Sequence, residues 1–446
     1  MKNNFIKSTI ILVIGGFFTK ILGMIIKIAL TRSIGTTGIG LYSLILPTFN
    51  LFITLSTMSL TISISKLVSE KKKKSKDIIL PIIPLTLLYN FLLILFILLL
   101  SPLLSKYLLK NPSTYLPIMC IGLTLPFICI SNLIRGYFFG KEKMFPHVFS
   151  NIFEQVVRLL LTIFLIPRFL KFGLSITISF VVLINIISEF SSILILLLFL
   201  PKHSISFSDF KFNKNITKEV LDISIPSTTT RLIGSLSYFL EPIILTFVLT
   251  SVGYSTDYIA LEYGIINGYV YPILLLPSFF TLAISNALLP VISNSYVNKN
   301  YEYSKYKIKQ AIFLSLLIGI PSTVLFILFP KIFLSFIYHT DQGIVYIKTI
   351  APIFLLYYIQ APLTSALQAM NKAKVAMSGT LIGSVIRIIF LFLLSYFKIG
   401  MWGLIISSLS NIIFITIHHL YYVKKYLKKE IWLFLFNYYY LLFLYY

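Results

Sequence analysis

Long apolar stretches alternate with short polar ones along almost the whole chain. Most of the apolar stretches are about 20 residues or longer, the length at which a helix crosses a bilayer. The pattern predicts twelve membrane-spanning helices, at residues 8–31, 40–65, 78–101, 115–134, 149–167, 174–200, 220–250, 260–292, 309–329, 347–368, 375–396 and 403–422. The runs are continuous and do not alternate residue by residue, which excludes an outer-membrane barrel. We therefore expect an all-α polytopic membrane protein.

The composition agrees with this class. Hydrophobic residues make up 57% of the chain and charged residues 12%, whereas soluble domains average about 25% charged residues. The N-terminus lacks a small-residue cleavage site, so the first span is expected to be retained. Cys120 and Cys129 fall in one predicted span and form no metal or disulfide spacing, so no cofactor and no metal site are expected.

The basic residues predict the orientation of the chain. The formal net charge is +24, but the excess lies in short loops between spans, where it sets topology, and we expect no nucleic-acid partner. Of the 38 lysines and arginines, 25 fall in alternate loops or at the adjoining span ends, eight in the opposite loops or at the adjoining span ends, and five deeper inside spans. This split predicts a protein of the cytoplasmic membrane with a cytoplasmic N-terminus. The run Lys71–Lys74 is expected to face anionic membrane lipids.

The chain is expected to form two lobes of six helices each. The longest polar segment, 201–219, would be a cytoplasmic linker between an N-lobe at 1–200 and a C-lobe at 220–424. Residues 425–446 are read as a short apolar tail or as a truncated extra helix. Each lobe has an even number of spans, which predicts parallel repeats related by a pseudo-two-fold axis along the membrane normal and alternating access by rocking of the lobes.

The evidence for this internal repeat is a matched spacing in the two halves. The pair Lys143 and Arg158 recurs as Lys372 and Arg387, and in each case the pair begins a span after a cytoplasmic turn.

Two lysines lie inside the first predicted span. Lys20 and Lys27 are seven residues apart, so they share one face of a helix. A charged side chain at the bilayer centre costs at least about 2.5–3.5 kcal/mol. We therefore predict that this helix lines a polar, cationic cavity. The alternative is that both lysines snorkel to the interface or pair with a carboxylate.

The other charged residues that lie more than three positions inside predicted spans are Arg158, Arg231, Arg387, Glu154, Glu189 and Glu241. Glu154 lies four residues before Arg158, so the two can pair on one helix face, and Arg158 can equally serve the substrate. Arg387 has Gly383 in the corresponding position. Glu241 precedes a proline at a kink site and either balances Arg231 or accepts a proton.

The cations inside the spans outnumber the acids. A cationic cavity suits an anionic cargo, and phosphate is the most common such group because arginine forks onto its oxygens and lysine acts as a point charge. The five histidines lie in loops or near span ends and form no cluster.

Several motifs resemble one known family of transporters. They are Gly35-Thr-Thr-Gly38-Ile-Gly40-Leu-Tyr42, Arg135-Gly136-Tyr137-Phe-Phe-Gly140, Glu154-Gln155-Val-Val-Arg158, Ser224-Ile-Pro226 with Arg231, and Gly268…Pro272…Pro277…Ala283…Leu289-Pro290. In order and spacing they resemble the stage V sporulation protein B group and related MurJ-like flippases for lipid-linked oligosaccharides, in the multidrug/oligosaccharidyl-lipid/polysaccharide exporter superfamily.

The resemblance implies a V-shaped bundle with a central cavity that flips an undecaprenyl-pyrophosphate-linked sugar across the cytoplasmic membrane. The family's basic residue before Leu-Gly matches Lys20, which precedes Leu22-Gly23. Where the family next has an arginine–aspartate pair, this chain has Ile26-Lys27. The eighth helix of the family carries a basic residue, and the matching position in this chain lies near Tyr271 with no basic residue beside it.

These observations predict a flippase, not an enzyme. The cargo would be a polyprenyl-pyrophosphate-linked glycan, a peptidoglycan precursor or a polysaccharide repeat unit, with the pyrophosphate held by Lys20, Lys27, Arg231 and Arg387. The driving force would be the membrane potential or exchange with H⁺ or Na⁺, with Glu154 and Glu241 as candidates for coupling or charge balance. The alternatives are a cation-coupled multidrug exporter of the same superfamily and a polyprenyl-sugar transferase.

Overall fold

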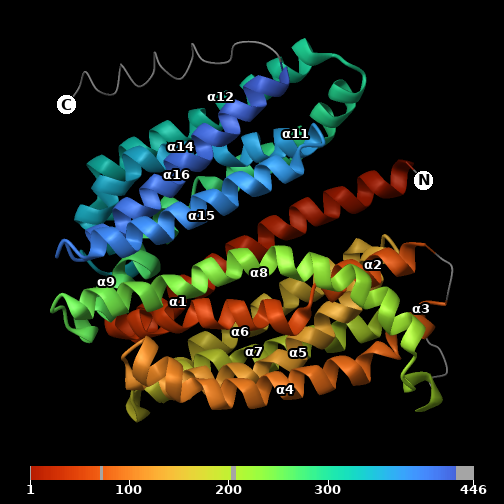
Figure 1. Cartoon of the computed structure of the whole chain (residues 1–446), viewed down its shortest axis with the longest axis horizontal. Helices are drawn as coiled ribbons and strands as arrows, with labels where there is room; N and C mark the ends of the chain where they lie inside the picture. The colour runs from red at the N-terminus through yellow and green to blue at the C-terminus, as the bar shows by residue number, and fades with distance from the viewer. Residues whose placement is uncertain (1, 71–73, 202–206, 428–446) are drawn as a thin grey trace. The chain divides into compact units, whose positions relative to one another are not determined.

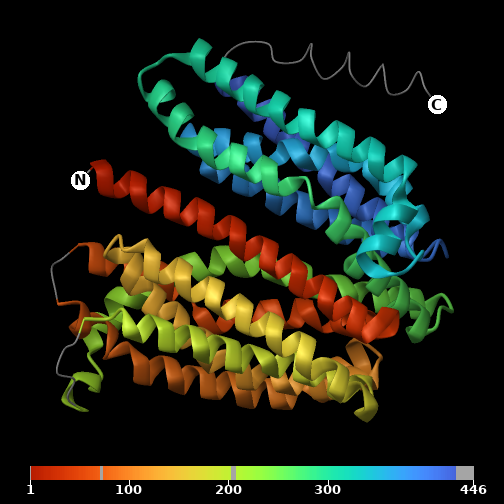
Figure 2. The same cartoon turned by 180° about the vertical axis from the view of Figure 1, so that it is seen from behind.

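The computed structural model describes residues 2–70, 74–201 and 207–427, and these residues form helices, turns and short connections without a β-strand. Figures 1 and 2 show the helices from opposite sides. The elements are α1 (Lys2–Thr57), α2 (Leu60–Ser69), α3 (Ser75–Ile79), α4 (Ile82–Leu103), η1 (Leu104–Leu108), η2 (Pro112–Thr114), α5 (Tyr115–Gly140), α6 (Met144–Phe169), η3 (Leu170–Phe172), α7 (Leu174–Leu198), η4 (Phe207–Phe210), α8 (Lys214–Ser251), α9 (Thr256–Gly264), η5 (Ile265–Val270), α10 (Tyr271–Leu274), α11 (Ser278–Val297), α12 (Tyr301–Leu328), α13 (Pro330–Tyr338), α14 (Ile344–Ala369), α15 (Ala373–Ser395) and α16 (Trp402–Leu427). The all-α prediction is confirmed.

Eleven helical segments of the described chain are long and apolar enough to cross a membrane. The first, Ile14–Ser69, has 56 residues and contains most of the predicted span 8–31 and all of the predicted span 40–65. A straight helix of that length would measure about 84 Å, far more than the roughly 30 Å of bilayer hydrocarbon. Gly35 divides it, because its φ of 66° and ψ of −172° are not helical, and positive φ costs glycine little. The protein is therefore a multi-pass membrane protein in which α1 has two arms.

One predicted span is not continuous. The stretch 260–292 was expected to be a single helix, but it is divided into α9, the π-helix η5, the short α10 and then α11. Pro272 and Pro277 explain the interruption, because proline has no backbone N–H to donate to the preceding turn. The residues before α11 form a turn in which Ser278 donates its backbone N–H to Leu275. Broken helices of this kind are tolerated at membrane depth where protein surrounds them.

The chain forms two compact units. Unit 1 comprises Met1–Tyr269, Phe336–Thr340 and Ser395–Met401, and unit 2 comprises Val270–Ser335, Asp341–Leu394 and Trp402–Tyr446. Helices α8 and α9 thus belong to the first unit. The lobe boundary at 201–219 stays a prediction. The run Lys71–Lys74 lies outside the described residues except for Lys74, and the tail 425–446 lies outside them from residue 428.

Hydroxyl groups link the helices inside unit 1. The Ser56 hydroxyl of α1 donates to the Asn90 side chain of α4 over 2.5 Å, and Ser63 of α2 lies 2.6 Å from Ser224 of α8. Such bonds hold membrane helices together where lipid gives no hydrophobic driving force. Helix α4 runs along one edge of the unit in both views (Figures 1 and 2). Its apolar side chains face outward, with Leu99 79% exposed, as expected of a lipid-facing helix.

Two glycines allow α1 and α9 to cross in close contact. A Cβ atom on Gly264 would overlap the Cα atom of Gly40 and lie 2.6 Å from its nitrogen. A Cβ atom on Gly40 would in turn overlap the Ala260 carbonyl oxygen. Small residues at such crossings let helix backbones approach one another in membranes.

We expect Gly264→Ala to destabilise the protein by roughly 1–3 kcal/mol, the usual cost of overpacking. The measurement is the apparent melting temperature of the purified protein in detergent. Gly234→Ala in α8 is the matched control, because nothing lies within 4 Å of its added methyl and alanine is the better helix former. A Gly264→Ala protein that melts with the wild type would show that the crossing tolerates a side chain.

Unit 2 is built around α11, α12, α14 and α16. Its buried core joins residues from all four helices, among them Ile292, Ala311, Leu363 and Val423. Helix α15 packs on α16 through Gly383, where a Cβ atom would lie 2.8 Å from the Ile415 side chain.

Candidate functional site

Lys20 lies on the first arm of α1. This arm packs on α6, where Gly15 lies so close to Val148 that it has no room for a side chain. Lys20 itself is exposed and makes no hydrogen bond or ion pair with any residue that the structure describes. No residue of the described chain therefore neutralises the charge of Lys20.

Lys27 lies two helical turns further along the same arm and is half-buried. Its ammonium donates to the backbone carbonyl of Asn267, with 2.8 Å between Nζ and the oxygen. Asn267 belongs to the π-helix η5, a kind of segment often found at functional sites. The acceptor is neutral, and an ammonium has three donors. Among the described residues Lys27 therefore has no acidic partner, and two of its three donors remain for another group.

Arg231 lies on α8 and is exposed. One turn later, Ser235 lies 2.9 Å from the Thr54 hydroxyl of α1, which fixes the two helices against each other. Among the described residues Arg231 has no acidic partner. Lys20, Lys27 and Arg231 therefore lie on two neighbouring helices of unit 1, and we call them the cationic set.

Glu154 and Arg158 form the ion pair that their spacing predicted. Arg158 donates through Nη2 to Oε1 of Glu154 over 2.6 Å. The pair belongs to a larger buried network, because Arg135 of α5 lies 2.6 Å from Oε2 of Glu154 and 3.6 Å from Oε2 of Glu189 on α7. Arg135 also donates to Ser192 over 2.9 Å. We call Arg135, Glu154, Arg158 and Glu189 the ion-pair network.

The ion-pair network is largely buried, and its positive and negative side chains are equal in number. It contains two arginines and two glutamates, and Arg135, Glu154 and Glu189 are only 9%, 4% and 6% exposed. The predicted span 115–134 ends one residue before Arg135, whereas α5 continues to Gly140 and contains Arg135. Both glutamates are thus committed to arginines. These two glutamates therefore do not balance the charges of the cationic set. A substrate role for Arg158 stays a prediction.

The remaining two predicted residues belong to neither group. Glu241 of α8 is buried and accepts a hydrogen bond from the Tyr263 hydroxyl over 3.1 Å. Arg387 is half-buried on α15 of unit 2. The position of α15 that corresponds to Glu154 is Gly383, which packs on α16 so closely that it has little room for a side chain. Their roles in coupling and binding stay predictions.

Comparison with known proteins gives matches over most of the chain. A family model described as "Polysaccharide biosynthesis protein" matches residues 5–296, and the MatE model matches residues 242–393. Stage V sporulation protein B of Bacillus subtilis (strain 168) is 34% identical over 405 residues, covering 88% of this chain and 78% of the relative. The lipid II flippase MurJ of the same organism is 23% identical over 422 residues, covering 87% and 77%.

Solved structures show the same fold. An inward-facing multidrug resistance MATE family transporter of the MOP superfamily has a TM-score of 0.74 at 15% identity, covering 92% of this chain and 96% of its own. The lipid II flippase MurJ in an inward closed conformation has a TM-score of 0.72 at 19% identity, covering 93% and 87%.

Proposed function

Since the chain belongs to the polysaccharide biosynthesis protein family, we propose that it is a flippase for an undecaprenyl-pyrophosphate-linked glycan. The cargo would cross the cytoplasmic membrane by alternating access, with its headgroup entering from the cytoplasm and its polyprenyl tail in the lipid. The relatives named a lipid II flippase and a sporulation protein support a glycan of the cell wall or spore envelope, and we favour the peptidoglycan precursor.

The observation that carries this proposal is the uncompensated charge of the cationic set. Lys20 and Arg231 are exposed, and Lys27 bonds only a neutral carbonyl within the described chain. Placing such charges at bilayer depth is unfavourable, and their attraction to a bound pyrophosphate would offset that cost. Arginine contributes a planar fork to phosphate oxygens and lysine a compact charge. Arg387 of unit 2 stays a predicted pyrophosphate-binding residue.

Coupling to an ion is the finer part of the proposal. Glu241 is buried at a Glu-Pro step of α8 and hydrogen-bonded to Tyr263, so it is our candidate for H⁺ or Na⁺ coupling or for charge balance. The lysine-rich alternate loops support a cytoplasmic N-terminus. The run Lys71–Lys74 would face anionic lipids on the same side of the membrane.

The proposal is tested with the purified full-length chain in lipid vesicles. We expect a pyrophosphate-linked disaccharide on undecaprenol to become accessible to a membrane-impermeant reagent on the far leaflet, faster than in protein-free vesicles. A polyprenyl glycoside without phosphate should move no faster than in those empty vesicles. Equal movement of both lipids, or of neither, would contradict the proposal.

The MatE match at residues 242–393 favours a second candidate, a cation-coupled multidrug exporter. Such an exporter takes organic cations, which the cationic set would repel. Ethidium efflux from the same vesicles under an imposed proton gradient would support this alternative.

A further inference from the structure

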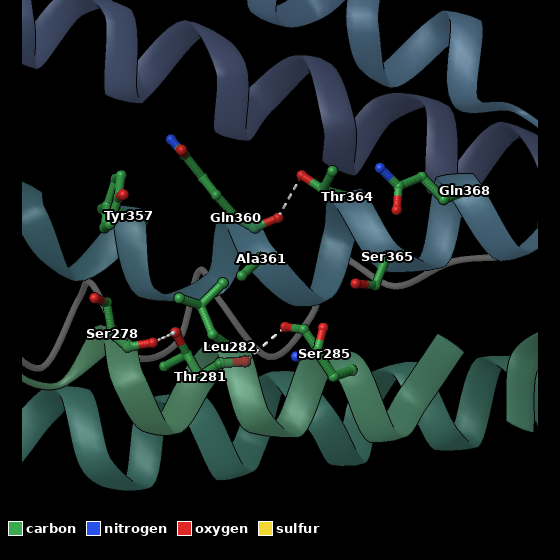
Figure 3. A pocket seen from close by; sticks show the side chains of 11 residues that line it. Ser278, Thr281, Leu282, Ser285, Tyr357, Gln360, Ala361, Thr364, Ser365 and Gln368 are labelled. Atoms are coloured by element: carbon green, nitrogen blue, oxygen red, sulfur yellow. Dashed lines mark hydrogen bonds between the residues drawn. The ribbon is translucent and has the colours of Figure 1, made fainter. Parts of the chain in front are cut away.

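Unit 2 contains a pocket between α11 and α14. Its volume is about 370 Å³, within the range of about 300–1,000 Å³ typical of ligand sites. Figure 3 shows hydroxyl side chains of α11 on one side and side chains of α14 on the other. Nine of the eleven lining residues carry a hydroxyl or carboxamide group, and none of the eleven is charged.

Four of the six hydroxyl groups that line this pocket, those of Ser278, Thr281, Ser285 and Thr364, donate their hydrogen to a backbone carbonyl one turn earlier in the chain. Ser278 donates to the Leu275 carbonyl over 2.5 Å and Ser285 to the Thr281 carbonyl over 2.6 Å, both within α11. On α14, Thr364 donates to the Gln360 carbonyl over 2.8 Å. A hydroxyl has one hydrogen and two lone pairs. With the hydrogen committed to the helix, each oxygen offers lone pairs to a ligand that donates.

The amide groups add acceptors and a smaller number of donors. Gln360 donates through Nε2 to the Ile412 carbonyl over 2.9 Å and to Thr416 over 3.0 Å, both on α16. Its carboxamide oxygen is therefore the atom left for a ligand. Asn286 and Gln368 are exposed and make no side-chain hydrogen bond within the described residues. These two amides can both donate and accept.

This chemistry excludes a phosphate and favours a sugar. A phosphate only accepts hydrogen bonds and needs cations or a dense set of donors, which the pocket lacks. The volume also far exceeds the roughly 30 Å³ that a molecule the size of water occupies, so a single ion does not fill it. Sugar hydroxyl and acetamido groups are neutral and rich in donors, and match a lining rich in acceptors.

We infer that the α11–α14 pocket binds the uncharged sugars of the lipid-linked cargo. This inference rests on the proposed function and adds the part of the headgroup that the cationic set does not recognise.

The test compares two lipids on the purified full-length protein: undecaprenyl pyrophosphate, and the same lipid carrying an N-acetylglucosamine-containing disaccharide. We expect the wild type to bind the disaccharide lipid more tightly. Asn286→Ala/Gln368→Ala should weaken that binding about tenfold, as expected for the loss of two neutral hydrogen bonds. Its affinity for the bare lipid should not change. Both residues are exposed, so the fold should survive, which the melting temperature checks.

Gln310→Ala is the matched control, because Gln310 is an exposed amide of α12 in the same unit, outside the pocket. If the double variant keeps the wild-type preference for the disaccharide lipid, or if the wild type has none, the pocket does not bind sugars and the proposed function still stands. If the wild type binds neither lipid, the proposed function fails and this inference fails with it.

Discussion

Replacing Lys27 and Arg231 together by glutamine is expected to lower translocation of the pyrophosphate-linked glycan about a hundredfold or more. A hydrogen bond to a charged group contributes roughly 1.5–3 kcal/mol, and two such losses amount to at least two factors of ten. Glutamine at position 27 keeps a donor for the Asn267 carbonyl, so the contact between α1 and η5 can persist while the charge is lost. The measurement is the initial rate of headgroup exposure in vesicles with matched protein content.

Two further variants show whether charge at these positions is the cause. Lys106→Gln/Arg168→Gln removes the same two residue types from exposed positions outside the predicted spans, and should leave translocation unchanged. Lys27→Arg/Arg231→Lys keeps both charges and should retain most of the rate. Wild-type translocation by the glutamine variant, or an equal loss in the Lys106 and Arg168 control, would refute the assignment of the cationic set.

The fold could be predicted from the sequence because its main constraint is local. Bilayer thickness fixes the length of an apolar helix, so the spans are visible in composition alone. Gly35 and Pro277 mark places where a helix is interrupted, since each residue type permits or imposes a non-helical backbone. The resemblance to the stage V sporulation protein B group is also confirmed, with 34% identity over most of the chain.

The site could be predicted only where the partners lie on one helix. The Glu154–Arg158 pair follows from a spacing of four residues and is confirmed by the 2.6 Å contact. Arg135 was missed because it follows a hydropathy boundary at residue 134, while the residues that stabilise it lie on α6 and α7. The available signal was Glu189, an acid inside a span with no basic residue one turn away on its own helix.

The α11–α14 pocket gives no such signal. Serine and threonine are common in membrane helices because they bond to their own helix carbonyls, so a single hydroxyl carries little information. What makes the pocket is the rotation of two helices that are far apart in sequence, which brings Ser285 and Thr364 to the same cavity. That rotation depends on the packing of the whole unit.

Arg135→Met is expected to destabilise the protein by about 3–5 kcal/mol, the cost of removing one partner from a buried ion pair. The variant leaves Glu189 buried without the arginine 3.6 Å away and leaves Glu154 with Arg158 alone. Methionine fills much of the same volume, so lost packing contributes little. A lower apparent melting temperature and a smaller monodisperse fraction on size-exclusion chromatography are the expected readouts.

A second substitution separates unbalanced charge from lost volume. In Arg135→Met/Glu189→Leu the remaining pair, Glu154 and Arg158, is balanced, and apolar replacement of a buried pair is often neutral or stabilising. We therefore expect the double variant to recover most of the stability lost by the single one, while Arg168→Met, at an exposed arginine, melts with the wild type. If the double variant is as unstable as Arg135→Met, charge compensation is not what stabilises the network. The contacts of Arg135 and Arg158 would then not explain why Glu154 and Glu189 are tolerated in the buried core.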